Sequence, residues 1–139
     1  MTPQEVKLVS DSFAKVLPIA GVTADIFYDR LFEIAPELRS LFPGNLADQK
    51  KKFVTMLATL ITNLHEFGKI APVIADLGKR HVDYGIISAH YEPFGTALLA
   101  ALEDCLGVDF TPPVKAAWTK AYGSLADVMK QAAASFPPR

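Results

Sequence analysis

Cysteine is nearly absent from this sequence: the 139 residues include one, Cys105. A single thiol can form neither an intramolecular disulfide nor a zinc site built from several thiolates, and such sparse usage is typical of a reducing cytoplasm. Long apolar runs are lacking too. A typical long run covers only residues 56–61, whereas a membrane-spanning helix needs about 20 apolar residues. The first residues lack the pattern of a signal peptide. We therefore expect a soluble cytoplasmic protein with no membrane partner.

An excess of charge of one sign is also missing. Fourteen basic side chains stand against fifteen acidic ones, for a formal net charge of −1. A nucleic-acid partner would require a clustered positive field, so none is expected. Hydrophobic residues make up 50% of the chain, an excess that either a core wrapped around an apolar ligand or a homodimer interface would explain. The composition favours a small, neutral or apolar ligand and a monomer or weak homodimer.

Several catalytic motifs have no counterpart here. The eight glycines occur singly and form neither a P-loop nor a dinucleotide fingerprint, and the sequence has no HExxH or GxSxG element. A zinc site would need three or four clustered His, Cys or carboxylate ligands. Cys105 falls inside an apolar helical stretch, where we expect a small buried thiol and not a nucleophile. These absences exclude the common hydrolase, nucleotide-binding and protein-only metal sites.

Apolar residues recur at three- and four-residue spacing along nearly the whole chain, and the alternation typical of strands is scarcely visible. The pattern predicts an all-α protein forming a single domain over residues 1–139, with a frayed tail at 136–139. Thr2, Pro3 and Glu5 form a capping-box signature at the first helix. The expected helices and turns cover residues 2–18, 21–35, 36–42, 46–64, 70–84, 88–106 and 111–135.

His81 is the one histidine at the centre of an apolar helical stripe, one turn after Leu77, whereas His65 and His90 lie near helix ends. From the pattern alone, a lone inward histidine is more often a hydrogen-bonded core residue than a metal ligand. Both interpretations therefore stay open on spacing alone.

Haem would satisfy these constraints together, because it needs one imidazole, a large apolar envelope and one or two polar donors opposite. Tyr28 and Gln49 lie on core-facing stripes and are the candidates for those donors. The alternatives are an ordinary buried tyrosine and a glutamine that bends into solvent. The Lys50-Lys51-Lys52 run is expected to be the solvated face of its helix.

Several segments in order along the chain carry a family resemblance: FYDRLF at 27–32, PELRSLF at 36–42, DLGKRHVDYG at 76–85, HYEPFG at 90–95 and AWTKAYG at 117–123. Over nearly its whole length the sequence resembles bacterial single-domain globins and the globin part of flavohaemoglobins. The resemblance implies a globin fold, a 3-over-3 helical sandwich around haem b.

The resemblance also implies roles for individual residues. His81 matches the proximal ligand of the haem iron, and Tyr28 matches the distal tyrosine of this bacterial group. Gln49 occupies the place of the distal histidine of animal globins, with Phe53 one turn further along the distal wall. The other implied haem contacts, including propionate partners and a tyrosine of the proximal network, are Phe42, Lys52, Leu57, Leu77, Arg80, Ile86, Tyr91 and Phe94.

The implied function is reversible binding of dioxygen, nitric oxide and carbon monoxide. Dioxygenation of nitric oxide would need an external reductase, because no reductase module is present in the sequence. Oxygen storage, transport or sensing would use the same pocket. The alternative is a haem-based or haem-free helical sensor or interaction domain, in which a haem-free core would hold His81 only as a hydrogen-bonded residue.

Overall fold

The computed structural model describes residues 2–42, 46–83 and 88–134, with side chains described except at 77–83, 88, 133 and 134. These described residues form helices and no strand, which confirms the all-α prediction. The α-helices are α1 (Pro3–Val16), α2 (Ala20–Ile34), α3 (Leu46–Thr62), α4 (Phe67–Asp83), α5 (Tyr91–Leu106) and α6 (Pro112–Ala134). Short 3-10 helices join them: η1 (Leu17–Ile19), η2 (Pro36–Leu41), η3 (Leu64–Glu66), η4 (Ser88–His90) and η5 (Gly107–Asp109).

The helix boundaries differ from the prediction where a 3-10 turn replaces the end of an α-helix. α1 ends at Val16 and not near Pro18, because proline has no N–H to continue the ladder. α4 starts at Phe67, three residues before the expected start, and carries Pro72 in its interior. α5 starts at Tyr91, since residues 88–90 form η4. The expected helix stop at Gly85 and the expected frayed tail lie outside the described residues.

The capping box at the start of α1 forms as the sequence predicts. The Thr2 hydroxyl accepts from the Glu5 main-chain N–H at 3.1 Å, and the Glu5 carboxylate accepts from the Thr2 N–H at 2.8 Å. Glu5 also forms a 3.1 Å ion pair with Lys120 of α6. The first turn of α1 is thereby tied to α6.

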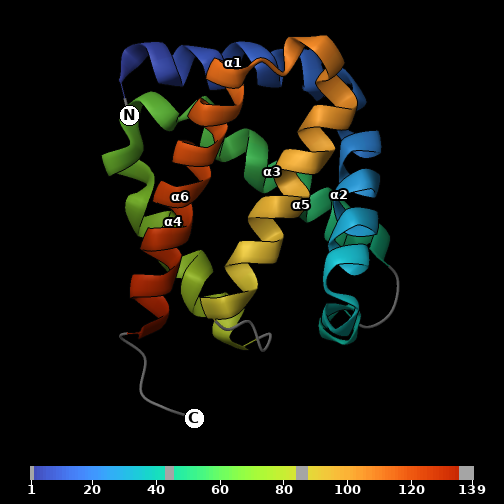
Figure 1. The fold of residues 1–139 in the computed structure, drawn as a ribbon. Coiled ribbons are helices and arrows are strands. Elements are labelled where there is room, and N and C mark those ends of the chain that lie inside the picture. Colours follow the sequence, from blue (N-terminus) through green and yellow to red (C-terminus); the bar gives the residue numbers. More distant parts are fainter. Residues whose placement is uncertain (1, 43–45, 84–87, 135–139) are drawn as a thin grey trace.

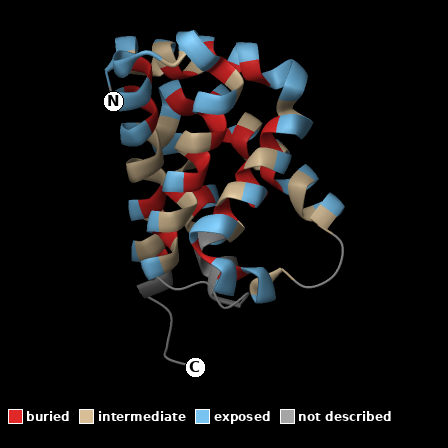
Figure 2. Cartoon of the chain, turned by 45° about the vertical axis from the view of Figure 1, so that its right-hand side comes forward, coloured by how far each residue is buried: buried red, intermediate tan, exposed pale blue. Residues whose placement is uncertain are grey.

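The helices pack in crossed layers (Figure 1). α1 lies across the ends of α5 and α6, while α3 passes behind them. α6 packs against α4 and α1, and α2 packs against α5 and α3. Figure 2 shows that the buried residues of each helix face the interior and that the exposed ones cover the outside. Among the described residues no helix is both long and apolar enough to cross a membrane.

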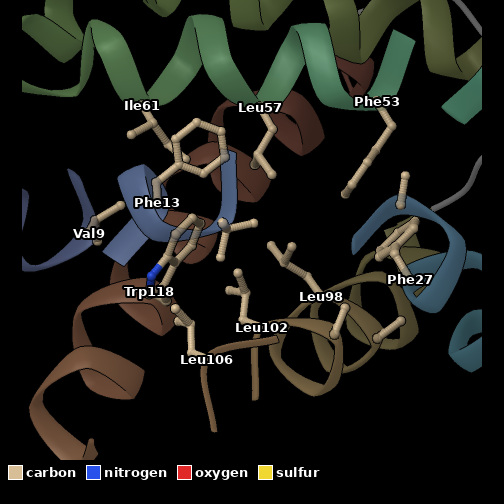
Figure 3. Close-up of a cluster of buried hydrophobic side chains, with 14 of the residues drawn as sticks. Val9, Phe13, Phe27, Phe53, Leu57, Ile61, Leu98, Leu102, Leu106 and Trp118 are labelled. Atoms are coloured by element: carbon tan, nitrogen blue, oxygen red, sulfur yellow. The ribbon is translucent and has the colours of Figure 1, made fainter. Parts of the chain in front are cut away.

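Trp118 belongs to the main hydrophobic cluster and lies close to Phe13 (Figure 3). Its ring lies next to that of Phe13, with centroids 6.4 Å apart, and its indole N–H donates to the Ser12 hydroxyl oxygen at 2.8 Å. The Ser12 hydroxyl is 2.7 Å from the main-chain oxygen of Leu8, to which it donates. A buried indole thus has its polar atom satisfied within the core, as buried polar groups require.

Some expected core positions are only half-buried. Cys105, expected to be a buried thiol, is one of them, and its sulfur lies 3.3 Å from the Thr23 hydroxyl oxygen. Helical spacing selects a face but does not say how completely neighbouring helices cover it. The other half-buried members of the predicted stripes are Val6, Phe32, Met56, Ile70, Phe94, Leu99, Tyr122 and Leu125.

Candidate functional site

Tyr28 is held in the interior by α2, with 3% of its surface exposed. Its ring meets Phe27, Phe42 and Phe53 edge-on, with centroid distances of 5.0, 5.6 and 6.0 Å. Such edge-to-face contacts hold a ring in one orientation. Burial raises the pKa of the Tyr28 hydroxyl above its ordinary value, so the phenol stays a neutral donor at physiological pH.

Gln49, in the first turn of α3, is half-buried. Its side chain interacts with the Tyr28 hydroxyl and acts against the effect of burial, lowering the pKa of Tyr28. The sequence left open whether Tyr28 is an ordinary buried tyrosine and whether Gln49 bends into solvent. In the structure the hydroxyl and the amide lie near each other, where α2 packs against α3.

An apolar wall adjoins this polar pair. Phe53 follows Gln49 by one turn and stacks on Phe27, with centroids 4.4 Å apart and planes at 17°. Leu57, one turn further along α3, is also buried. In Figure 3, Phe53 and Leu57 project from the same face of α3 towards the interior. The structure therefore brings together four of the predicted residues, Tyr28, Gln49, Phe53 and Phe42, with Leu57 next along the wall.

The predicted proximal residues lie on α4 and just after it. α4 runs through positions 77, 80 and 81, so Leu77, Arg80 and His81 share one helix as the periodicity predicts. The side chains at these positions, and all of Ile86, lie outside the described part of the chain. Their assigned roles, including iron ligation by His81, stay predictions.

Tyr91 opens α5 and is buried in a cluster that also contains Ile74 of α4 and Met129 of α6. Burial raises the pKa of its hydroxyl. Phe94, half-buried, meets the Tyr91 ring edge-on at 6.0 Å. The main-chain oxygen of Tyr91 accepts a 2.6 Å hydrogen bond from the Tyr122 hydroxyl. Both predicted residues therefore belong to one cluster with residues of α4 and α6.

The lysine run is not uniformly solvated, contrary to the prediction. Lys51 and Lys52 are exposed, but the ammonium of Lys50 lies 2.9 Å from a carboxylate oxygen of Asp25 and its side chain is 29% exposed. The ion pair joins α2 to α3. A charge run in the sequence does not reveal a partner on another helix, which is why this contact was missed. Lys52 as a propionate partner stays a prediction.

The donor set fits a cofactor that brings most of its own metal ligands. Among the described residues, no group of three or more His, Cys, Asp or Glu side chains is placed to hold a metal ion. The site instead offers aromatic walls, a buried phenol, an amide and a nearby helix with one histidine. Haem supplies four ligands to its iron and needs one axial imidazole, so these residues fit it.

Similarity to known proteins identifies the family of this chain. The globin family model matches residues 25–129. The chain belongs to the globin family. This globin is 42% identical over 106 residues to a flavohemoprotein of Bacillus subtilis, covering 73% of this chain and 26% of that one. It is 30% identical over 121 residues to a flavohemoprotein of Rhodopirellula baltica, covering 82% and 30%.

The globin therefore spans less than a third of the length of these curated relatives. Among solved structures, it resembles an engineered carbene transferase from Rhodothermus marinus that is named as a nitric oxide dioxygenase. The TM-score is 0.87 at 25% identity, with 96% of this chain and 94% of that chain covered. The predicted resemblance to globins of the flavohaemoglobin group is confirmed.

Proposed function

We propose that this globin binds haem b through His81 and reversibly binds dioxygen, nitric oxide and carbon monoxide on the side of Tyr28 and Gln49. The observation that carries the proposal is the buried Tyr28, whose hydroxyl interacts with the Gln49 side chain beside an aromatic wall. Two relatives named flavohemoproteins support the cofactor.

The haem would supply an iron centre with one open position for a diatomic gas. Tyr28 and Gln49 would donate hydrogen bonds to a ligand that carries partial negative charge. A hydrogen bond to a charged acceptor is worth about 1.5–3 kcal/mol, or roughly ten- to a hundredfold in affinity. The raised pKa of Tyr28 keeps its proton in place for this task. Phe27 and Phe53 exclude water from the pair.

Nitric oxide dioxygenation is the catalytic use that we propose for the site. One nitric oxide and one dioxygen, with one electron supplied by an external reductase, give one nitrate ion. The structural neighbour named as a nitric oxide dioxygenase supports this reaction. Oxygen storage, transport or sensing would draw on the same two donors and needs no reductase.

The visible absorption spectrum of the purified protein tests the cofactor. We expect a Soret band that His81→Ala removes and that the matched variant His65→Ala, at an exposed histidine of η3, leaves in place. A wild-type protein without the band would favour the alternative, a haem-free helical sensor or interaction domain. Mixing the oxygenated protein with nitric oxide in a single turnover then tests whether nitrate forms in stoichiometric yield.

A further inference from the structure

Arg39, in η2, holds Phe42 at both polar groups of its main chain. The Phe42 N–H donates to the main-chain oxygen of Arg39 at 3.1 Å, and the Arg39 guanidinium donates to the main-chain oxygen of Phe42. η2 ends at Leu41, so these hydrogen bonds form where a helix end leaves main-chain groups without helical partners. One residue thereby fixes the main chain from which the Phe42 ring projects.

The same guanidinium lies over an aromatic ring of α2. Its central carbon is 5.7 Å from the centroid of the Phe32 ring, within the range of a cation–π attraction. The Phe32 ring is in turn tilted against the Phe42 ring, with centroids 6.0 Å apart. Arginine can make both contacts at once, because its planar group donates hydrogen bonds in its plane and stacks through its face. Arg39 therefore joins the end of η2 to α2.

Both aromatic partners of Arg39 also lie against Tyr28. The Phe42 ring meets the Tyr28 ring edge-on at 5.6 Å, and the Phe32 ring lies 6.0 Å from it at an angle of 39°. Tyr28 is buried, whereas Arg39 is exposed. A surface residue thus contacts two residues whose rings pack on the buried phenol of the candidate site.

We propose that Arg39 is a positioning residue for this site. By fixing the main chain of Phe42 and covering Phe32, it holds both rings against Tyr28 and keeps the Tyr28 hydroxyl aimed at the bound ligand. The part that concerns the ligand rests on the function proposed above, whereas the control of the Tyr28 ring does not. The opposing interpretation is that Arg39 only closes η2 and stabilises the fold.

NMR of protein labelled in its tyrosine rings tests the control of Tyr28. The protein is used as purified, reduced under carbon monoxide, and the Tyr28 signals are identified by their loss in Tyr28→Phe. Arg39→Met, which keeps an unbranched side chain but no donor or charge, should shift the Tyr28 ring signals. The signals of Tyr91 and Tyr122, which lie on α5 and α6, should stay in place.

Arg30→Met is the matched control, because it removes an arginine of α2 that forms ion pairs with Glu33 and Asp104. It should leave the Tyr28 signals as in the wild type. Arg39→Lys, which keeps the charge but not the planar group, should give a milder shift and serves if Arg39→Met impairs folding. Tyr28 signals that stay unchanged in both Arg39 variants, or that shift equally in Arg30→Met, overturn the proposal.

Gas release measured by stopped flow tests the effect on the ligand. Arg39→Met should accelerate dioxygen release by about threefold to fivefold, as for the partial loss of a hydrogen bond to a charged acceptor, and carbon monoxide release by less. In the Tyr28→Phe background it should have no further effect, because Arg39 acts through the Tyr28 hydroxyl. A residue that only closes η2 would lower the free energy of unfolding and leave the ratio of the two release rates unchanged. An unchanged ratio, or a full effect in the Tyr28→Phe background, overturns the proposed role. A protein without haem overturns the proposed function and leaves the NMR result to decide whether Arg39 positions Tyr28.

Discussion

The Tyr122 hydroxyl donates a 2.6 Å hydrogen bond to the main-chain oxygen of Tyr91, joining the middle of α6 to the first residue of α5. Gly95 makes this approach possible, because a Cβ there would lie 2.7 Å from the Tyr122 ring carbon Cε2. The Tyr91 side chain belongs to the buried cluster that also contains Ile74 of α4. The hydrogen bond therefore fixes the start of α5 against α6.

Gly95→Ala should destabilise the fold although alanine favours helices. The new methyl group meets the Tyr122 ring, and overpacking of a core costs about 1–3 kcal/mol, which outweighs the helix-propensity gain of up to about 1 kcal/mol. Gly123→Ala is the matched control, since a Cβ at that helical position meets nothing within 4 Å. Urea denaturation should show a lower free energy of unfolding for the first variant and an equal or higher one for the second. Equal stabilisation by both would contradict the close approach of α5 and α6.

Stability should fall in alkali because of the buried tyrosines. Burial raises the pKa values of Tyr122, Tyr91 and Tyr28 above the value of about 10 for an unfolded chain. Above that pH the unfolded chain releases protons that the folded protein retains, so the free energy of unfolding decreases as pH rises. Below it these residues cause no pH dependence. Urea denaturation between about pH 8 and about pH 11 should show a shallower decrease for Tyr122→Phe than for the wild type, because the variant lacks one of the buried hydroxyls whose pKa is raised. Parallel curves would mean that Tyr122 ionises freely in the folded state.

Ser12→Ala should lower the free energy of unfolding by more than the loss of a single oxygen atom suggests. The substitution leaves the buried Trp118 N–H without its 2.8 Å partner, and an unsatisfied buried donor costs about 1–3 kcal/mol. Trp118→Phe in the Ser12→Ala background removes that donor, so the two substitutions should be non-additive in a double-mutant cycle of thermal or urea unfolding. Additive free energies would show that the hydrogen bond does not stabilise the fold.

The spacing of apolar residues was enough to predict the helices and the inward faces that bear Tyr28 and Phe53. Both predictions depend on the 3.6-residue period, which is a local property of the sequence. The same period places His81 on α4 with Leu77. The predicted start of α4 was wrong by three residues. Proline is more typical of the first turn of a helix, but Pro72 lies inside α4, which begins directly after η3.

Contacts between helices could not be predicted in the same way. Nothing local to Gln49 says that its partner is Tyr28, and nothing in the lysine run says that Lys50 faces Asp25. The apolar hollow lined by Leu57 and Trp118 is harder still to predict, because it depends on how closely the side chains of several helices pack. A pattern of residue types reports which side chains are buried and does not report the gaps between them.

Tyr28→Phe is the substitution that separates a distal donor from an ordinary core tyrosine. It keeps the aromatic contacts with Phe27 and Phe53 and removes only the hydroxyl, which interacts with Gln49. If the proposed function holds, dioxygen release measured by stopped flow should accelerate by about tenfold or more, from the loss of one hydrogen bond to a charged acceptor. Release of carbon monoxide, which carries less charge when bound, should change less. Gln49→Leu should also accelerate dioxygen release. Combining it with Tyr28→Phe should give less than the product of the two effects, because the two side chains interact with each other. An unchanged release rate in Tyr28→Phe, with the Soret band retained, would remove Tyr28 from the ligand site and leave it a residue of the core.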